Sequence, residues 1–160
     1  RLPIGEPAVI REGSDLTILT FGSTLYRAMD AAKKFEAEYG VSVEVIDGQT
    51  LVPFNYEPLL RSVKKTGKVI LASDACERGS YMHTIAGQLT QMAFDDLDAP
   101  VTVIGAANWI VPPAEMEEEY FPQVFSFFDA YHQQIKPLPG YTPVIDRSKE
   151  EMIYANKWGI

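Results

Sequence analysis

Residues 69–72 form an uninterrupted apolar run, Val-Ile-Leu-Ala, with a glycine and a lysine before it and a serine and an aspartate after it. A run of this length without polar alternation is typical of a strand covered on both faces, as in a parallel sheet between two layers of helices. Other strand patterns occupy residues 16–21, 41–47 and 101–104. Because the intervening segments carry apolar residues at helical spacing, strands and helices alternate, which predicts right-handed crossovers and a mostly parallel sheet.

The N-terminal part of the chain predicts an exception to the parallel order. Residues 8–11 and 16–21 are two extended runs joined by the turn cluster Glu-Gly-Ser-Asp. Two runs with so short a connection are typical of an antiparallel hairpin. We therefore expect an α/β fold, a three-layer α/β/α sandwich whose mostly parallel sheet of about five strands has one antiparallel edge strand. The domain would span residues 1–136, with 137–160 as a C-terminal tail that packs on its own domain or on a partner.

The ends of the helices are marked by residues with known capping preferences. Ser23 is positioned to cap the first helix, and Gly40 to follow its end in a left-handed conformation. Asn55 is expected to cap a short second helix. Ser80 precedes the next helix, and Pro122 is expected at the first position of the last one.

The composition restricts the class of protein. Of the 160 residues, 46% are hydrophobic and 22% charged, as in globular domains. The net charge of −8 repels a phosphate backbone, so nucleic acid is not an expected partner. No apolar stretch reaches the roughly 18 residues that span a bilayer, so we expect no membrane association. The single Cys76 allows no internal disulfide, which fits the cytoplasm or, in a eukaryote, the mitochondrial matrix.

Polar residues follow the carboxyl ends of the predicted strands, where open α/β sheets bind their ligands. Asp47 and Asp74 could form an acid/base pair or bind a metal, but an Asp at a strand end more often caps the following turn. Cys76 could be a nucleophile, but free cysteines are more often small buried side chains. His83 needs a hydrogen-bond partner to act in catalysis, so a surface or interface position is favoured. His132 is expected to be solvated.

Two glycine–serine pairs, Gly22-Ser23 and Gly79-Ser80, precede helices and could bind an anion through free backbone N–H groups. Neither the GxGxxG nor the GxxxxGK[ST] pattern is present, so the signal for a nucleotide is weak. No set of Cys and His has the spacing of a metal site. We therefore predict no catalytic, cofactor-binding or metal-binding residue in this chain.

Five phrases of the sequence, in this order, resemble one family. The most specific is Ser-Val-Lys-Lys-Thr-Gly at residues 62–67. The phrases lie at Gly5 with residues 8–17, at 45–47 with 50–53, at 62–69, at 97–101 and at 120–122. Over roughly residues 4–136 the chain resembles the C-terminal domain of the beta subunit in thiamine-diphosphate-dependent 2-oxo acid dehydrogenases of the pyruvate and branched-chain types. Transketolase shares this domain, a three-layer α/β sandwich.

The resemblance implies an oxidoreductase that decarboxylates a 2-oxo acid and passes the acyl group to lipoyl groups. In such enzymes thiamine diphosphate and Mg²⁺ are held between two other domains. The parent enzyme is thus expected to use both, while this chain binds neither and is inactive alone. The sequence begins with Arg1 rather than methionine, which we interpret as a piece of a longer protein.

The family's C-terminal domain serves mainly in subunit association. The implied partners are the N-terminal domains or alpha subunit of the parent enzyme, further copies in a homo-oligomer, and a dihydrolipoyl acyltransferase. Two regions combine aromatic residues with residues atypical of the family, and we predict interface residues there. They are Asp74, Tyr81, His83 and Tyr120.

Departures from the family pattern cluster at strand ends, at Gly48, Gln49, Asn55, Ser73, Ser80 and Thr84. A divergent member with alpha and beta parts fused in one chain is our hypothesis for them. Two alternatives stay open. One is a stand-alone module that binds a small ligand around Asp47, Asp74 and Asn108. The other is the same domain from a different thiamine enzyme, such as transketolase or deoxyxylulose-phosphate synthase.

Overall fold

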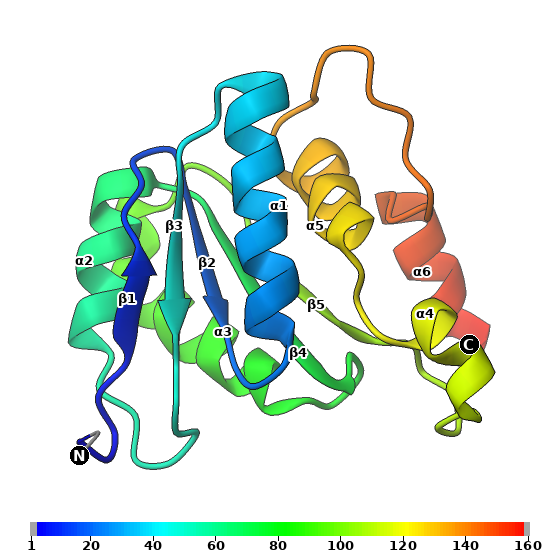
Figure 1. Ribbon diagram of the computed structural model, residues 1–160, viewed down its shortest axis with the longest axis horizontal. Coiled ribbons are helices and arrows are strands. Elements are labelled where there is room, and N and C mark those ends of the chain that lie inside the picture. Colours follow the sequence, from blue (N-terminus) through cyan, green and yellow to red (C-terminus); the bar gives the residue numbers. More distant parts are fainter. Residues whose placement is uncertain (1–2, 159–160) are drawn as a thin grey trace.

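The computed structural model describes residues 3–158 and places a single five-stranded sheet at the centre of the molecule (Figure 1). The strand order is β1-β3-β2-β4-β5. Four strands run parallel, and β1 at one edge is antiparallel to β3. The strands are β1 (Ala8–Arg11), β2 (Leu16–Thr20), β3 (Val43–Asp47), β4 (Val69–Cys76) and β5 (Thr102–Ala106).

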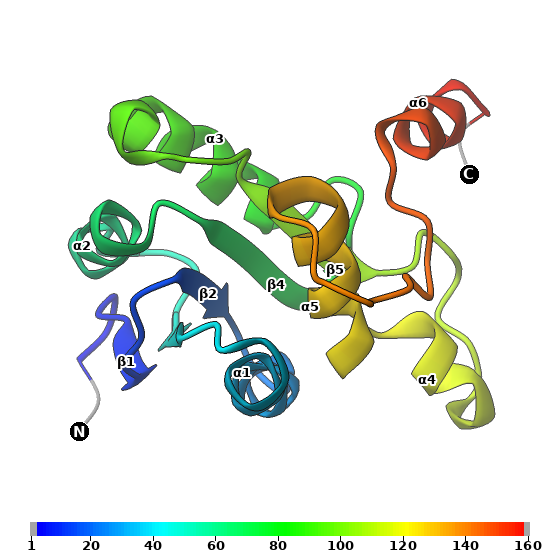
Figure 2. The ribbon, with the colours of Figure 1, turned by 90° about the horizontal axis from the view of Figure 1, so that it is seen from above.

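Helices cover both faces of the sheet, which confirms the three-layer α/β/α fold (Figure 2). Helices α1 and α5 lie on one face, and α2 and α3 on the other. A π-helical turn, Tyr131–Ile135, continues α5. The helices are α1 (Thr24–Tyr39), α2 (Glu57–Thr66), α3 (Tyr81–Ala93), α4 (Glu117–Tyr120), α5 (Val124–Ala130) and α6 (Lys149–Trp158).

The core is divided by the sheet into two apolar clusters. Alternate residues of β2 supply them: Ile18 packs toward α1 and α5, and Leu19 toward α2 and α3. All five residues of β2 are buried, as expected for a central strand with helices over both faces. On the α1 side, Phe35 stacks on Phe128 with ring centroids 4.1 Å apart, which joins α1 to α5.

The expected hairpin is wrong, although the antiparallel edge strand is confirmed. β1 pairs with β3, and β3 lies between β1 and β2. The turn after β1 is fastened to the start of β3, because the backbone N–H of Asp15 donates to the Ser42 carbonyl at 2.8 Å and the Asp15 carboxylate accepts the N–H of Ser42 at 2.8 Å. These bonds carry the chain across the end of β3 instead of folding β2 back onto β1.

Helix capping agrees with the sequence at some ends and not at others. Gly40 follows α1 with φ of 66°, as expected. The Asn55 side chain accepts the N–H of Glu57 at 3.0 Å at the start of α2, also as expected. Ser23 precedes α1 but makes no capping hydrogen bond, so that prediction is wrong. Pro122 lies two residues before α5, where Gln123 makes a capping box instead.

The family-specific phrase at residues 62–67 stabilises the sheet through buried polar contacts. The Thr17 hydroxyl of β2 hydrogen-bonds the Ser62 hydroxyl at 2.6 Å and the Thr66 hydroxyl at 2.7 Å. Lys65 forms an ion pair with Glu44 of β3, whose side chain is only 3% exposed. Burial alone would raise the pKa of Glu44, but hydrogen bonds from Lys65 and Ser62 hold that pKa below its ordinary value of 4.5.

We expect the Glu44→Gln variant to be less stable than the wild type by about 1 kcal/mol near neutral pH, a modest value because Lys65 stays 42% exposed and solvent screens the pair. A carboxylate whose pKa is lower in the folded than in the unfolded protein stabilises the folded state at pH values above its unfolded pKa. This stabilisation is lost as the pH falls through the folded pKa. The difference in urea midpoint between the wild type and Glu44→Gln should therefore be constant at pH 6–7 and should decrease below about pH 4.5. A gap that widens with acid would contradict this assignment.

Candidate functional site

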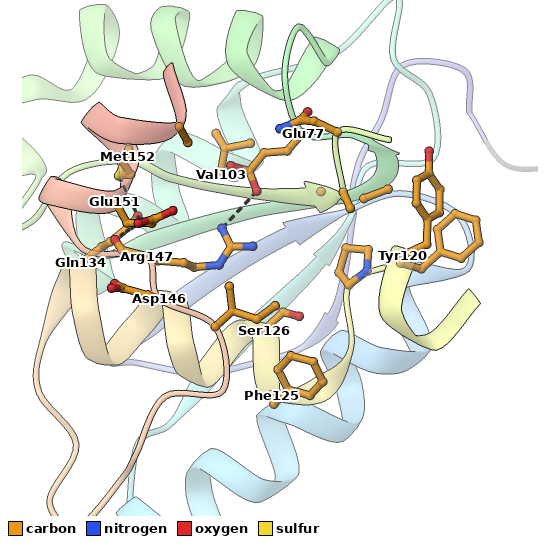
Figure 3. Close-up of a pocket in the computed structure, with 18 of the residues that line it drawn as sticks. Glu77, Val103, Tyr120, Phe125, Ser126, Gln134, Asp146, Arg147, Glu151 and Met152 are labelled. Carbon is orange, nitrogen blue, oxygen red and sulfur yellow. Dashed lines mark hydrogen bonds and ion pairs between the residues drawn. The ribbon is translucent and has the colours of Figure 1, made fainter. Parts of the chain in front are cut away.

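A cavity of about 390 Å³ lies along the outer edge of β5, opposite the edge that pairs with β4 (Figure 3). One wall is α3, another is the start of α5, and a third comes from the C-terminal segment with α6. The floor is apolar, with Val103 and Gly105 from β5, Val101 just before that strand, and Ala86 from α3. The cavity thus lies between the carboxyl end of the sheet and the C-terminal segment, which is distant from β5 in the sequence.

Arg147 extends across this cavity from the C-terminal segment (Figure 3). Its Nη1 donates to the Glu77 carboxylate at 3.0 Å, and the Arg147 side chain is 14% exposed. Gln134 of the π turn donates to the Arg147 carbonyl at 3.3 Å, and Gln133 accepts the Arg147 N–H at 2.7 Å. The Nε of Arg147 is buried and has no hydrogen-bond partner among the described residues. One donor in the cavity therefore lacks an acceptor.

The segment that carries Arg147 is fixed by a buried carboxylate. Asp129 of α5 is fully buried, and it accepts three hydrogen bonds from the C-terminal segment. The donors are the Tyr141 hydroxyl at 2.7 Å and the backbone N–H groups of Val144 and Ile145, both at 2.9 Å. Burial, followed by the bond to Asp129, raises the pKa of Tyr141 well above its ordinary value. Asp129 thereby places one wall of the cavity.

The cavity is rich in carboxylates but holds no recognisable catalytic set. Its lining includes five acidic residues against one arginine, the acidic ones being Glu77, Glu118, Glu119, Asp146 and Glu151. No group of three or more His, Cys, Asp or Glu suited to a metal is found in residues 3–158. The only other titratable nitrogen in the lining is His83, which is exposed and lies on α3.

The strand-end residues that the sequence singled out have different partners, and the structure brings two of them, Cys76 and Asn108, together. Asp47 accepts the N–H of Gln49 at 3.2 Å, so it caps its own turn. Cys76 is half-buried rather than part of the core, and its thiol donates to the Asn108 side chain at 3.1 Å. His132 is not simply solvated, because its Nδ1 accepts the N–H of Leu138 at 2.9 Å.

The four predicted interface residues lie in different environments. Asp74 and His83 are exposed, and Tyr81 is half-buried at the start of α3. Tyr120 is only 5% exposed, and its ring contacts Trp109 and Phe121, so little of that ring is available to a partner. His83 and Tyr120 both line the cavity, whereas Asp74 and Tyr81 do not.

Sequence reasoning missed the residues that build the cavity. Glu77 and Arg147 are 70 positions apart, and no local pattern links them. Asp129 had a usable signal, since it interrupts the aromatic run Val-Phe-Ser-Phe-Phe-Asp-Ala-Tyr that begins at residue 124. A carboxylate on an apolar helix face needs donors, and those donors come from the segment 141–145.

In the described part of the chain, no helix is both long enough and apolar enough to cross a bilayer.

Comparison with known proteins places this fold among characterised ones. A family model described as "Transketolase, C-terminal domain" matches residues 5–126. The 2-oxoisovalerate dehydrogenase subunit beta of Bacillus subtilis (strain 168) is 36% identical over 121 residues, which are 75% of this chain and 37% of that protein. The pyruvate dehydrogenase E1 component subunit beta of Rhizobium meliloti (strain 1021) is 36% identical over 130 residues, 81% of this chain and 28% of that protein. The chain therefore spans well under half the length of these relatives.

A solved structure supports the same grouping. The chain of a structure titled "Split gene transketolase, inactive beta4 tetramer" superimposes with a TM-score of 0.69 and 28% identity. The match covers 81% of this chain and 42% of that chain.

Proposed function

Because this chain belongs to the family of transketolase C-terminal domains, we propose that it is the C-terminal association domain of the beta subunit of a 2-oxo acid dehydrogenase. The observation that carries the proposal is the similarity to two curated beta subunits, which extends over most of this chain in each case. The parent enzyme would decarboxylate pyruvate or a branched-chain 2-oxo acid and transfer the acyl group to lipoyl groups. One of these relatives is named for 2-oxoisovalerate and the other for pyruvate, which supports either type of substrate.

The thiamine diphosphate and Mg²⁺ of the parent enzyme would be held by other domains. Two observations support this proposal: the described part of the chain has no cluster of His, Cys, Asp or Glu suited to a metal, and the Asp47 carboxylate accepts a hydrogen bond from the N–H of Gln49 in its own turn. Thiamine chemistry also needs an enclosed, preorganised site. We therefore assign this chain no catalytic step.

Exposed apolar residues support a role in assembly. The loop after β5 exposes 52% of Trp109, 92% of Ile110 and 66% of Val111, next to the acidic helix α4. Adjacent exposed apolar side chains of this size are typical of protein interfaces. We propose that this loop, with Asp74, Tyr81 and His83 of the neighbouring elements, contributes to contacts with the rest of the parent enzyme, with an alpha subunit or with further copies. Tyr120, which is buried, would contribute by supporting Trp109, whose ring it contacts. Docking of a dihydrolipoyl acyltransferase belongs to the same proposal.

We also propose the division into a domain at residues 1–136 and a C-terminal segment at 137–160. The segment lies outside the residues that the family model matches. A bacterial cytoplasm or a mitochondrial matrix would be the compartment, since one relative is named as mitochondrial and others are bacterial.

The test uses the full-length protein that contains this chain. With thiamine diphosphate, Mg²⁺, the alpha subunit where this is a separate chain, and ferricyanide as electron acceptor, we expect it to oxidise 2-oxoisovalerate or pyruvate. The isolated 160-residue chain should turn over neither acid and should give no heat with Mg²⁺ and thiamine diphosphate in calorimetric titration. Micromolar binding by the isolated chain would contradict the assignment of the cofactor to other domains.

Assembly is followed in the same preparation by sedimentation. The Ile110→Asp variant of the full-length protein should form smaller particles, because it places a charge on a surface that is to be desolvated. Tyr26→Asp on α1, which is 76% exposed, is the matched control and should leave the particle size unchanged. Equal sizes for all three proteins would contradict a role of this loop.

A transketolase subunit is the second candidate, favoured by the structure of a split gene transketolase. It predicts transfer of a two-carbon unit between ketose and aldose phosphates and no reaction with 2-oxo acids. Xylulose 5-phosphate and ribose 5-phosphate in the same assay distinguish the two candidates.

A further inference from the structure

The loop between β3 and α2, residues 48–56, presents aliphatic side chains to solvent at the carboxyl end of the sheet. Val52 is 73% exposed and Leu51 is 43% exposed. The corresponding loop between β2 and α1 exposes Gly22 and Ser23 instead. Apolar side chains that are exposed singly are ordinary on a protein surface, whereas adjacent ones are typical of a surface that another body covers.

A third exposed aliphatic side chain, Ile4, lies beside this loop, because the residue after it is fastened there. The N–H of Gly5 donates to the Thr50 hydroxyl at 2.9 Å, and the Gly5 carbonyl accepts the N–H of Asn55 at 2.8 Å. The Thr50 hydroxyl in turn donates to the Pro53 carbonyl at 3.0 Å. Figure 1 shows the segment before β1 next to the loop between β3 and α2. Ile4 is 78% exposed, so it extends the apolar surface of the loop.

The backbone beneath these side chains is held in place in both segments. Gly5 is buried with φ of 87°, and a Cβ atom there would lie 3.2 Å from Cγ of Pro53, so the two segments pack closely. The Asn55 side-chain amide donates to the Glu6 carboxylate at 2.9 Å. A backbone that is already fixed loses little conformational entropy when its side chains bind. The three exposed side chains form a surface that we call the entry patch: Ile4, Leu51 and Val52.

The position of the entry patch indicates what covers it. The family model is that of a C-terminal domain, and the chain spans 37% and 28% of the two curated beta subunits. In a protein of that organisation, the larger remainder precedes this chain and joins it within a few residues of Ile4. A body attached by so short a connection has an effective concentration of about millimolar at the patch. A second copy or a separate alpha subunit would have to displace it.

We propose that the entry patch packs against an apolar surface of the domain that precedes this chain in the parent protein, and that this contact fixes the orientation of the two domains. The opposite surface consists of aliphatic or aromatic side chains, because a charge facing Val52 would lose its water without compensation. The contact is separate from the loop at 109–111, which follows β5 at the other edge of the sheet from β1. The inference rests on the proposed function only in that this chain is the C-terminal part of a longer subunit.

The test is hydroxyl-radical footprinting of the full-length protein, with the labelled side chains located by mass spectrometry. The rate at each residue is divided by its rate in the urea-unfolded protein, which removes differences in intrinsic reactivity. Val52 and Tyr26 of α1 are matched in this chain, at 73% and 76% exposed. We expect Val52 to react about fivefold more slowly than Tyr26 on this scale, as a surface covered in most molecules requires. Equal rates would overturn the proposal, because the patch would then be open.

Dilution of the same protein identifies the covering body. A contact within one chain does not depend on concentration, whereas a contact with a second copy or a separate alpha subunit is lost when the assembly dissociates. The protein is diluted until sedimentation shows single subunits. We expect the protection of Val52 to persist there, and its loss together with the assembly would overturn the proposal.

Matched variants test the apolar character of the contact. Ile4→Asp places a charge in the entry patch, so we expect the rate at Val52 to rise about threefold. Tyr26→Asp makes a similar change on α1 and should leave the rate at Val52 unchanged. Equal effects of the two variants would contradict the proposal, and both positions are exposed, so the fold is retained. The footprint needs no substrate, so its outcome is independent of the reaction that the full-length protein catalyses.

Discussion

Replacement of Gly13 by alanine is expected to destabilise the protein by about 3 kcal/mol, the upper part of the range for overpacking. A Cβ atom at this position would lie 2.1 Å from the carbonyl carbon of Val43 and 2.2 Å from the nitrogen of Glu44. Both are backbone atoms of β3, which cannot yield as a flexible side chain would. β3 is also held in register by strands on both of its sides. The new methyl group must therefore displace the turn that carries the chain from β1 to β2.

The measurement is the urea midpoint by circular dichroism, with Gly87→Ala as the matched control. Gly87 lies in α3, and a Cβ atom there would meet nothing within 4 Å. Because alanine is the better helix former, this control should gain about 0.5–1 kcal/mol. The same substitution is thus expected to have opposite signs at the two sites. A Gly13→Ala protein with the midpoint of the wild type would contradict the crossing geometry.

Replacement of Asp129 by alanine is the second large effect that we expect, a loss of about 3 kcal/mol. The carboxylate is fully buried and accepts bonds from Tyr141, Val144 and Ile145. Without it, the two backbone N–H groups lose their acceptor, and the C-terminal segment must open toward water to satisfy them. Limited proteolysis should then cut residues 139–148 faster than in the wild type, before the domain itself is digested.

Two further variants show whether the carboxylate or the packing of the segment is responsible. Tyr141→Phe keeps the ring beside Phe128 and removes one of the three donors, so it should cost only about 1 kcal/mol. Asp146→Asn changes an exposed carboxylate of the same segment and should have little effect. If Asp129→Ala resisted the protease as well as the wild type does, the segment would be held by other contacts.

Local patterns in the sequence determined much of the fold, because they depend on near neighbours. The apolar run at 69–72 is the fully buried start of β4, as its lack of alternation indicates. Gly40 ends α1 because a left-handed residue is needed there. The Met82, Ile85 and Leu89 spacing predicts the buried face of α3, although Met92, one turn further along, is 49% exposed.

Pairing partners were harder to predict, because a strand pattern states which faces are buried and not which strand lies alongside. The short connection at 12–15 suggested that β1 and β2 pair, yet two hydrogen bonds between Asp15 and Ser42 placed β3 between them. The helix at 149–158 was also missed. Its apolar residues show only a weak helical pattern, since none of them is buried in this chain.

The sequence by itself determined the layers of this protein and the positions of most strands and helices, because these depend on the periodicity of apolar residues. It also determined the family, because the family's motifs are contiguous in the sequence. Only the tertiary structure decided the candidate site. Glu77 and Arg147 meet across 70 positions, and Asp129 fixes the segment that brings Arg147 there. The position of β5 at the edge of the sheet likewise follows only from the strand order, which ends at that strand. These features arise from long-range packing, in which residues without any local signal become neighbours when the sheet and its helices close around the core.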